Sequence, residues 1–184
     1  MLSTQTPIRS GKVQRWYDEN NDLHREDGPA VICTYGSQFW YKHGKQHRED
    51  GPAVISPTYE EWWCNGKLHR EDGPAFKYHS NIVEKWYLNG ELHREGGPAV
   101  IQPGFKAWYR HGLQHREDGP AVENSEQSHY YLFGVMYQKD KFIRLVRIIK
   151  RFNNNLKKKY RERVRLAIYT NTKMCQDVSD LISQ

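Results

Sequence analysis

The sequence contains few cysteines and no apolar run long enough to cross a membrane. Its three cysteines, Cys33, Cys64 and Cys175, lie far apart without paired spacing. That pattern argues against a disulfide framework or a zinc site and fits a reducing compartment. No apolar stretch approaches the ~18–20 residues of a membrane span, and the N-terminal residues include no signal-like apolar segment. We therefore expect a cytoplasmic chain without a transmembrane segment.

Apolar residues are also scarce, while aromatic residues are not. The apolar share is 37%, below the ~45–50% that is usual for globular domains, and the mean hydropathy is −0.94. Such a chain has too few long apolar runs for an enzyme built around one wide core. Aromatic residues nevertheless reach 13%, which excludes wholesale disorder. A length of 184 residues favours one domain with an appendage.

The net charge of +6 is divided unevenly along the chain. Residues 1–137 contain 15 Lys and Arg against 18 Asp and Glu, whereas residues 138–184 contain 13 against 4. The basic character therefore belongs to the C-terminal segment. We therefore expect any electrostatic attraction to a polyanionic partner to come from residues 138–184.

An internal repeat organises residues 13–137. LHREDGPAV begins at Leu23 and returns four times with small changes, at intervals of 22 to 24 residues. An aromatic pair and a turn signal such as Asn65-Gly66 precede the later copies. The repeated histidines are His24, His47, His69, His93 and His115, and the first residues of the aromatic pairs are Trp16, Trp40, Trp62, Trp86 and Trp108.

A sixth, degenerate unit follows the five clear ones. Tyr130-Tyr131 occupies the aromatic position, Gly134 the turn position and Tyr137 the position of histidine. Arrays of repeats commonly end in such an atypical unit. We divide the chain into an N-terminal extension (1–12), the repeat array (13–137) and a basic helical cap or tail (138–184).

Each unit predicts a β-hairpin with a short third segment. The aromatic strand leads through a tight turn into a strand containing His-Arg-Glu, and Asp-Gly-Pro interrupts the ladder. Ala-Val-Ile begins a further strand, which ends in a variable loop. A single unit is too small to bury its aromatic residues, so stacking of units has to supply the core. The array predicts a rod roughly 50–60 Å long.

The unit W-Y-x-N-G-x-L-H-R-E-x-G-P-A resembles a divergent MORN-type repeat, of the variant found in bacterial, large-phage and giant-virus proteins. The similarity covers about residues 14–137 and includes the aromatic and glycine pairs Tyr41/Gly44, Trp63/Gly66, Tyr87/Gly90 and Tyr109/Gly112. The resemblance implies an elongated array of antiparallel β-hairpins that serves as a scaffold or interaction surface. It also suggests a viral or phage origin, in which case the protein is expected in the host cytoplasm or the virion.

The HRED block contains residue types used in catalysis and in metal binding. A catalytic site is normally needed once, however, and this block occurs five times. We therefore interpret it first as a structural ladder in which the arginine of one unit meets an acid of the next. Metal or phosphate binding and catalysis are the lesser alternatives. We predict no catalytic residues, no metal site and no cofactor, and we expect no small-molecule ligand.

The aromatic column also has two interpretations. Exposed, stacked Trp and Tyr side chains can bind bases or sugar rings. Because almost no other large apolar residues are available for a core, we expect the tryptophans to form it.

The C-terminal segment has helical periodicity. An apolar stripe predicts helices over 139–151 and 156–169, with a break at Asn153–Asn155, and residues 172–184 could add a short helix. The other faces are basic. The candidate residues for a partner or nucleic acid are Arg144, Arg147, Lys150, Arg151, Lys157, Lys158, Lys159, Arg161, Arg163 and Arg165.

Several functions are compatible with this segment. It can cap the open end of the array, bind nucleic acid through its cations, contact an acidic protein or lie on an anionic membrane surface. We expect a non-enzymatic scaffold that binds a protein partner, either a virion component or an inhibitor of host machinery. The alternative is an RNA- or DNA-binding protein that acts through its basic helices.

Overall fold

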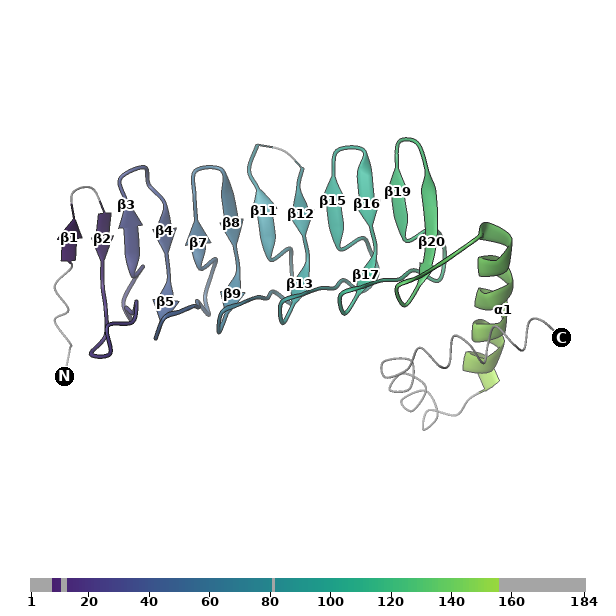
Figure 1. Cartoon of the computed structure of the whole chain (residues 1–184), viewed down its shortest axis with the longest axis horizontal. Helices are drawn as coiled ribbons and strands as arrows, with labels where there is room; N and C mark the ends of the chain where they lie inside the picture. Colours follow the sequence, from purple (N-terminus) through teal and green to yellow (C-terminus); the bar gives the residue numbers. More distant parts are fainter. Residues whose placement is uncertain (1–7, 11–12, 81, 156–184) are drawn as a thin grey trace.

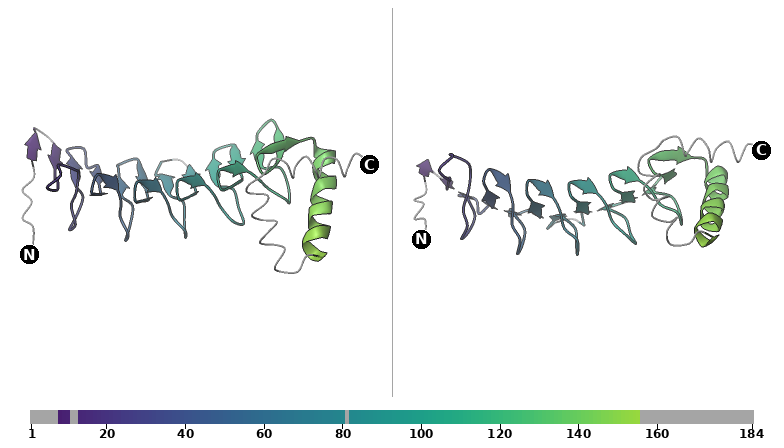
Figure 2. Two further views of the ribbon diagram at one scale, coloured as in Figure 1. Left: turned by 60° about the horizontal axis from the view of Figure 1, so that its bottom comes forward. Right: turned by 90° about the horizontal axis from the view of Figure 1, so that it is seen from below.

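The computed structural model describes residues 8–10, 13–80 and 82–155, which form short strands followed by one helix (Figure 1). Thirteen strands make one long antiparallel sheet, accompanied by four two-stranded sheets. The strands run across the long axis of the molecule, and the short hairpins project to one side of the long sheet (Figure 2). The prediction of a mainly β protein with a C-terminal helix is confirmed.

The long sheet is built from hairpins that follow one another along the chain. In order across the sheet, its strands are β1 (Ile8–Ser10), β2 (Val13–Arg15), β3 (Val31–Cys33), β4 (Gln38–Phe39), β7 (Val54–Ile55), β8 (Tyr59–Glu61), β11 (Phe76–Tyr78), β12 (Glu84–Lys85), β15 (Val100–Gln102), β16 (Phe105–Ala107), β19 (Val122–Asn124), β20 (Ser128–Leu132) and β21 (Val135–Tyr137). Strand β1 lies in the segment that the sequence analysis left outside the array.

The two-stranded sheets lie beside this long sheet. They pair β5 (Tyr41–Lys42) with β6 (Lys45–Gln46), β9 (Trp63–Cys64) with β10 (Lys67–Leu68), β13 (Tyr87–Leu88) with β14 (Glu91–Leu92), and β17 (Tyr109–Arg110) with β18 (Leu113–Gln114). Each turn uses two residues with positive φ, for example Asn65 (49°) and Gly66 (77°). This is the geometry that Asn-Gly favours in two-residue hairpins.

Two predictions about the unit were wrong. The short strands end at Gln46 and Leu68, one residue before the histidine, so the His-Arg-Glu segment is not a strand. The stretch after Ala-Val-Ile is also more than a loop, because it turns back as a second strand of the long sheet. Strands β7 and β8, for example, pair in the register Val54 to Glu61. Each repeat therefore makes two hairpins, one in the long sheet and one short.

The fully buried residues are small. The alanine after each Gly-Pro has no exposed surface, as at Ala53 and Ala99, and its carbonyl accepts the backbone N–H of the repeat's tryptophan. Of the repeated tryptophans, Trp16 is 7% exposed and the other four are half-buried. The expectation of a tryptophan core was therefore only partly right.

Helix α1 (Lys139–Asn155) packs against the last unit of the array. Phe142, Leu145 and Val146 are buried with Leu132 in one cluster, which confirms the predicted apolar stripe at these positions. Phe152, assigned to the same stripe, is 58% exposed. The helix includes Asn153–Asn155, so the predicted break at these residues was wrong. The helices predicted over 156–169 and 172–184 lie outside the described residues.

Candidate functional site

The arginine of each HRED block lies over the tryptophan of its own repeat. The guanidinium carbon is 3.8–4.2 Å from the ring centroid in all five repeats. In four repeats its Nε also donates to the aspartate two residues later, at 2.8–2.9 Å, as in the pair Arg48–Asp50. These hydrogen bonds hold the pKa of each of the four aspartates below its usual value. The expectation that arginine meets the acid of the next unit was wrong, because the pair closes within one repeat.

The histidine of each block joins its repeat to the next one. Its Nδ1 accepts the backbone N–H of the first turn residue of the following repeat, for example Asn89 N–H to His69 at 3.1 Å. The same bond occurs at all five histidines, with distances of 3.1–3.3 Å. Since Nδ1 accepts, a neutral ring carries its proton on Nε2. That nitrogen lies 3.5–3.9 Å from the glutamate two residues later in four repeats.

Two backbone hydrogen bonds complete each connection between successive repeats, which we call a joint. The N–H of the turn glycine donates to the carbonyl of the residue before the histidine of the preceding repeat, as in Gly66 to Gln46 at 2.8 Å. The backbone N–H of the arginine donates to the carbonyl of the second aromatic residue of the next repeat, as in Arg48 to Trp63 at 3.1 Å. The short hairpins are thus linked to one another although they form separate two-stranded sheets. All five histidines are used in this connection.

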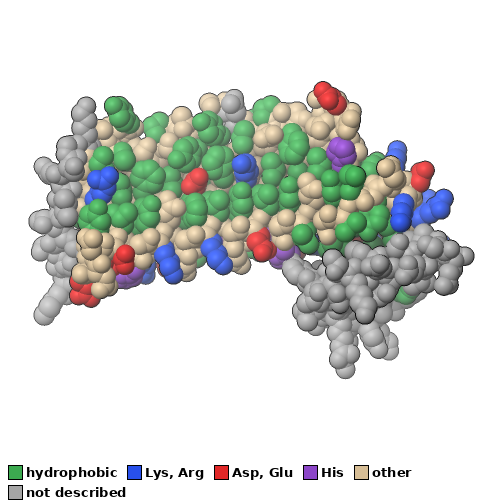
Figure 3. Space-filling model, viewed as in Figure 1, with side chains coloured by type: hydrophobic (Ala, Val, Ile, Leu, Met, Phe, Trp, Pro, Cys, Tyr) green, Lys and Arg blue, Asp and Glu red, His purple; other side chains and the backbone are tan. Residues whose placement is uncertain are grey.

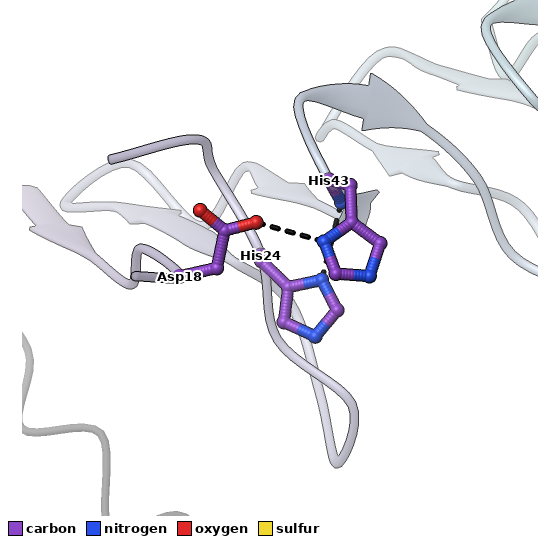
Figure 4. A group of neighbouring side chains, drawn as sticks. All are labelled: Asp18, His24 and His43. Carbon is purple, nitrogen blue, oxygen red and sulfur yellow. Dashed lines mark hydrogen bonds and ion pairs between the residues drawn. The ribbon is translucent and has the colours of Figure 1, made fainter. Parts of the chain in front are cut away.

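The first joint contains an additional carboxylate (Figure 4). Asp18 Oδ2 lies 2.8 Å from His43 Nδ1, the rings of His24 and His43 are 4.2 Å apart, and potential ligand atoms of the three residues lie within 4.8 Å of one another. The hydrogen bond to His43 lowers the pKa of Asp18. His24 Nδ1 is occupied by the His43 N–H at 3.1 Å. A metal ion placed between these atoms has to break the joint, so we interpret the group as a reinforced turn.

The basic candidates on α1 are exposed. Arg144, Arg147, Lys150 and Arg151 lie on faces away from the buried stripe. Lys150 is close enough to Glu117 to contribute to the lowered pKa of that carboxylate, whose main cause is the hydrogen bond from His115. The remaining candidates fall outside the described residues; they are Lys157, Lys158, Lys159, Arg161, Arg163 and Arg165.

A second surface was not found by sequence reasoning. Residues paired across the long sheet share a face, and one of the two faces is mostly apolar. We call it the apolar face. Its central row runs across the sheet through Arg15, Val31, Phe39, Val54, Glu61, Phe76, Lys85, Val100, Ala107, Val122 and His129, and Tyr59, Tyr78 and Phe105 flank this row.

Hydrophobic side chains spread over this surface with few charges among them (Figure 3). The opposite face of the same strands is charged, with Lys77 opposite both Glu60 and Glu84 and with Lys106 opposite Glu123. The alternation of residues in strands was the signal for this difference. It was missed because the second strand of each hairpin was taken for a loop.

Comparison with known proteins gives no relative: no family model, no curated protein and no solved structure matches the chain. Among the residues that the structure describes, no helix is long and apolar enough to cross a membrane.

Proposed function

We propose that the protein is a non-enzymatic scaffold, a MORN-like rod of β-hairpin repeats that holds a protein partner along its row of variable loops. The observation that carries the proposal is the contrast between constant joints and variable loops. The HRED blocks repeat almost unchanged, whereas the loops that join the two strands of each hairpin in the long sheet differ from repeat to repeat. A rigid frame that presents varied loops is the usual arrangement of a recognition surface.

The loops also present large apolar side chains to solvent. Tyr35 is 83% exposed and Ile82 is 73% exposed. Both lie in loops at the same end of the strands of the long sheet, between β3 and β4 and between β11 and β12. Exposed aromatic and aliphatic residues at regular intervals suit a protein partner better than a small ligand. The repeated histidine side chains bond to the next repeat, and the repeated arginine side chains bond within their own repeat, as at His47 and Arg48. This structural use of the ionisable residues favours a non-enzymatic role.

The test is chemical cross-linking and affinity capture from the native host, with the wild-type chain and the double variant Tyr35→Ser/Ile82→Ser. We expect one or a few proteins to be captured reproducibly by the wild type and lost with the double variant. Leu113→Ser is the matched control, because Leu113 is also exposed (44%) but lies in the short hairpin β17–β18. Equal capture by all three proteins contradicts the assignment of the loops.

A second function is supported by the exposed cations of α1. Arg144, Arg147 and Arg151 lie on the side of the helix away from its packed stripe. Such a surface can neutralise phosphates without reading sequence. Its test is binding of a labelled single-stranded RNA and a DNA duplex over a range of salt concentrations. The variant Arg144→Gln/Arg147→Gln/Arg151→Gln is expected to lose affinity and salt dependence, and no binding by the wild type at physiological salt removes this alternative.

A further inference from the structure

We propose that the apolar face binds the same face of a second copy of the chain, to form a symmetric dimer of two antiparallel rods. The proposal goes beyond the scaffold function and does not depend on it. It starts from the charged residues of the central row, which interrupt an otherwise apolar surface. Only Glu61 and Lys85 are charged in the interior of the row, and each lies next to Phe76 across the sheet.

In the described part of the chain, no helix and no crossing segment lies over this face (Figure 3). The valines and the alanine of its central row are themselves 0–9% exposed, and Leu92 and Tyr109 of the short hairpins pack against this row near Val100. The accessible part of the face is therefore formed by larger, partly buried side chains: Phe39, Tyr59, Glu61, Phe76, Tyr78, Lys85 and Phe105.

The segments that carry the repeated arginines pack over Trp16, Trp40 and their equivalents. Trp40 directly follows Phe39, so in an extended strand the two side chains point to opposite faces. Helix α1 packs against Tyr130 and Leu132, which alternate with the apolar-face residues His129 and Tyr131. Both coverings therefore lie on the other side of the sheet.

The order of residues in the row is nearly the same from both ends. Starting from Phe76 and moving outward, each side has one charged residue and then Val54 or Val100. The next strands have Phe39 on one side and Ala107 on the other, both apolar, and the strands beyond them have Val31 and Val122. The ends of the row are Arg15 and His129. The only inversion is at the first step, where one charge is negative and the other positive.

This inversion is what a two-fold axis requires. An axis parallel to the strands and passing through Phe76 turns one rod end for end, so Glu61 of each copy faces Lys85 of the other. Phe76 then meets its own counterpart, and Val54 faces Val100. The alternative symmetric arrangement, with both rods in the same direction, brings Glu61 onto Glu61 and Lys85 onto Lys85. Charge complementarity therefore selects the antiparallel pair.

The centre of the face is suited to be the core of such an interface. Tyr59, Phe76 and Tyr78 form a cluster with ring centroids 5.8–6.2 Å apart. Lys85 Nζ lies 5.4 Å from the Phe76 centroid, and Trp63 Nε1 donates to Glu61 Oε2 at 2.7 Å. Both charged groups are thus held against aromatic rings at the middle of the surface. Clustered aromatic residues at the centre are typical of the residues that dominate binding energy.

The size of the face is also sufficient. The central row crosses eleven strands, from β2 to β20, so at a spacing of ~4.8 Å it is about 48 Å long. Strands of mostly two or three residues make the face roughly 10 Å wide. Each copy then buries roughly 500 Å², or about 1,000 Å² for the pair, which is the lower end of the range for a specific interface. Aligned packing of two sheets is also a common arrangement in β proteins.

The test is the mass of the purified full chain in solution, measured by sedimentation over a wide range of concentrations with four variants. We expect the wild type to form a dimer of twice 21.9 kDa. Glu61→Lys and Lys85→Glu each place like charges opposite one another in both pairs of the dimer. Each is expected to raise the dissociation constant at least about tenfold, and the double variant Glu61→Lys/Lys85→Glu restores opposite charges and the dimer.

Glu60→Lys is the matched control, since it makes the same change one residue away on the opposite face and leaves the dimer intact. Circular dichroism and thermal unfolding of each variant separate dissociation from loss of fold, and if Glu61→Lys does not fold, Lys85→Glu and the double variant still decide the matter. A wild type that is monomeric throughout overturns the proposal. A dimer that Glu61→Lys leaves unchanged, or that the double variant fails to restore, overturns it as well.

Discussion

At the scale of single residues, the repeated HRED block is explained by the contacts that its arginine and its histidine make. Arginine covers the tryptophan of its own repeat, and histidine connects to the next repeat. The fourth repeat separates the contributions, because Gly96 replaces the aspartate there and has a φ of 77°. Arg94 still lies 3.8 Å from the Trp86 centroid and donates to Pro98 O at 3.1 Å. The contact with the ring therefore does not depend on the ion pair.

This difference gives the first prediction. Arg48→Ala removes the contact with Trp40 and the hydrogen bond to Pro52 O, and we expect it to lower the free energy of unfolding by about 1–2 kcal/mol. Asp50→Asn removes only an exposed partner and is expected to change that free energy little. Urea unfolding followed by tryptophan fluorescence measures both. A loss with Asp50→Asn as large as that with Arg48→Ala contradicts the prediction.

The second prediction concerns the histidine joints. His47→Phe and His69→Phe keep a ring but leave the N–H of Asn65 or Asn89 without its acceptor. Each is expected to lower the free energy of unfolding by about 1–3 kcal/mol, by similar amounts because the joints are equivalent. His79→Phe is the control, since His79 is exposed and lies outside the repeated position. If one of the five positions affects an activity and the others affect nothing, the structural interpretation is wrong.

At the scale of elements, the sequence predicted the short hairpins well and the long sheet poorly. Asn-Gly and His-Gly turns have a local conformational signature, so β9–β10 and its equivalents could be placed from a few residues. The strands of the long sheet are only two or three residues long in most hairpins, and polar residues such as Glu60 and Lys77 interrupt them. Their identity as strands comes from pairing with neighbouring repeats, which no local pattern contains.

The two candidate surfaces, the cations of α1 and the apolar face, also differ in how far the sequence predicts them. Exposed cations on α1 could be predicted because helical periodicity separates them from Phe142 and Leu145. The apolar face was missed, because alternation within strands of two or three residues is a weak signal without the register between different repeats. Ala53 and its equivalents were missed as core because alanine alone carries little hydrophobic signal.

The third prediction concerns the contact between α1 and the array. Leu145 is 4% exposed within the cluster around Leu132, so Leu145→Ala is expected to lower the free energy of unfolding by about 2–4 kcal/mol. Part of the helical circular dichroism signal is expected to be lost at a lower urea concentration than the β signal. Arg144→Ala, on the exposed neighbour, is the control with no such effect. A single transition, unchanged in both variants, contradicts the described packing.

The fourth prediction is a pH dependence at the same end of the array. The hydrogen bond from His115 and the nearby cations Arg110 and Lys150 lower the pKa of Glu117 from its usual 4.5. A lowered pKa stabilises the folded state above the unfolded-state value, and this contribution is lost as pH falls through the folded-state value. We therefore expect Glu117→Gln to be less stable than the wild type at pH 7 and to lose less stability on acidification below pH 4.5. Urea unfolding at a series of pH values measures the two slopes, and parallel slopes contradict the prediction.

At the scale of the whole molecule, each repeat contacts its neighbours through the same small set of bonds. The joint between the second and third repeats has the same donors and acceptors as the joint between the fourth and fifth, with Asn65 or His111 as the turn residue. No described joint depends on a residue from a distant repeat. Stability should then be close to a sum of repeat and interface contributions, and the number of interior repeats should be adjustable.

The last prediction follows from this equivalence. Deletion of residues 93–114 removes one full period of 22 residues and joins Leu92 directly to His115, so the HRED context is preserved. The shortened chain is expected to fold with lower stability and to be shorter by about 10 Å, since two strands of the long sheet are lost at ~4.8 Å each. Small-angle X-ray scattering measures this difference, best in a Glu61→Lys background so that self-association does not contribute. Deletion of residues 93–103 removes half a period, puts Gly104 where a histidine has to follow Leu92, and is expected to break the array. If both deletions unfold the protein equally, the joints are not interchangeable and the molecule behaves as a single cooperative core.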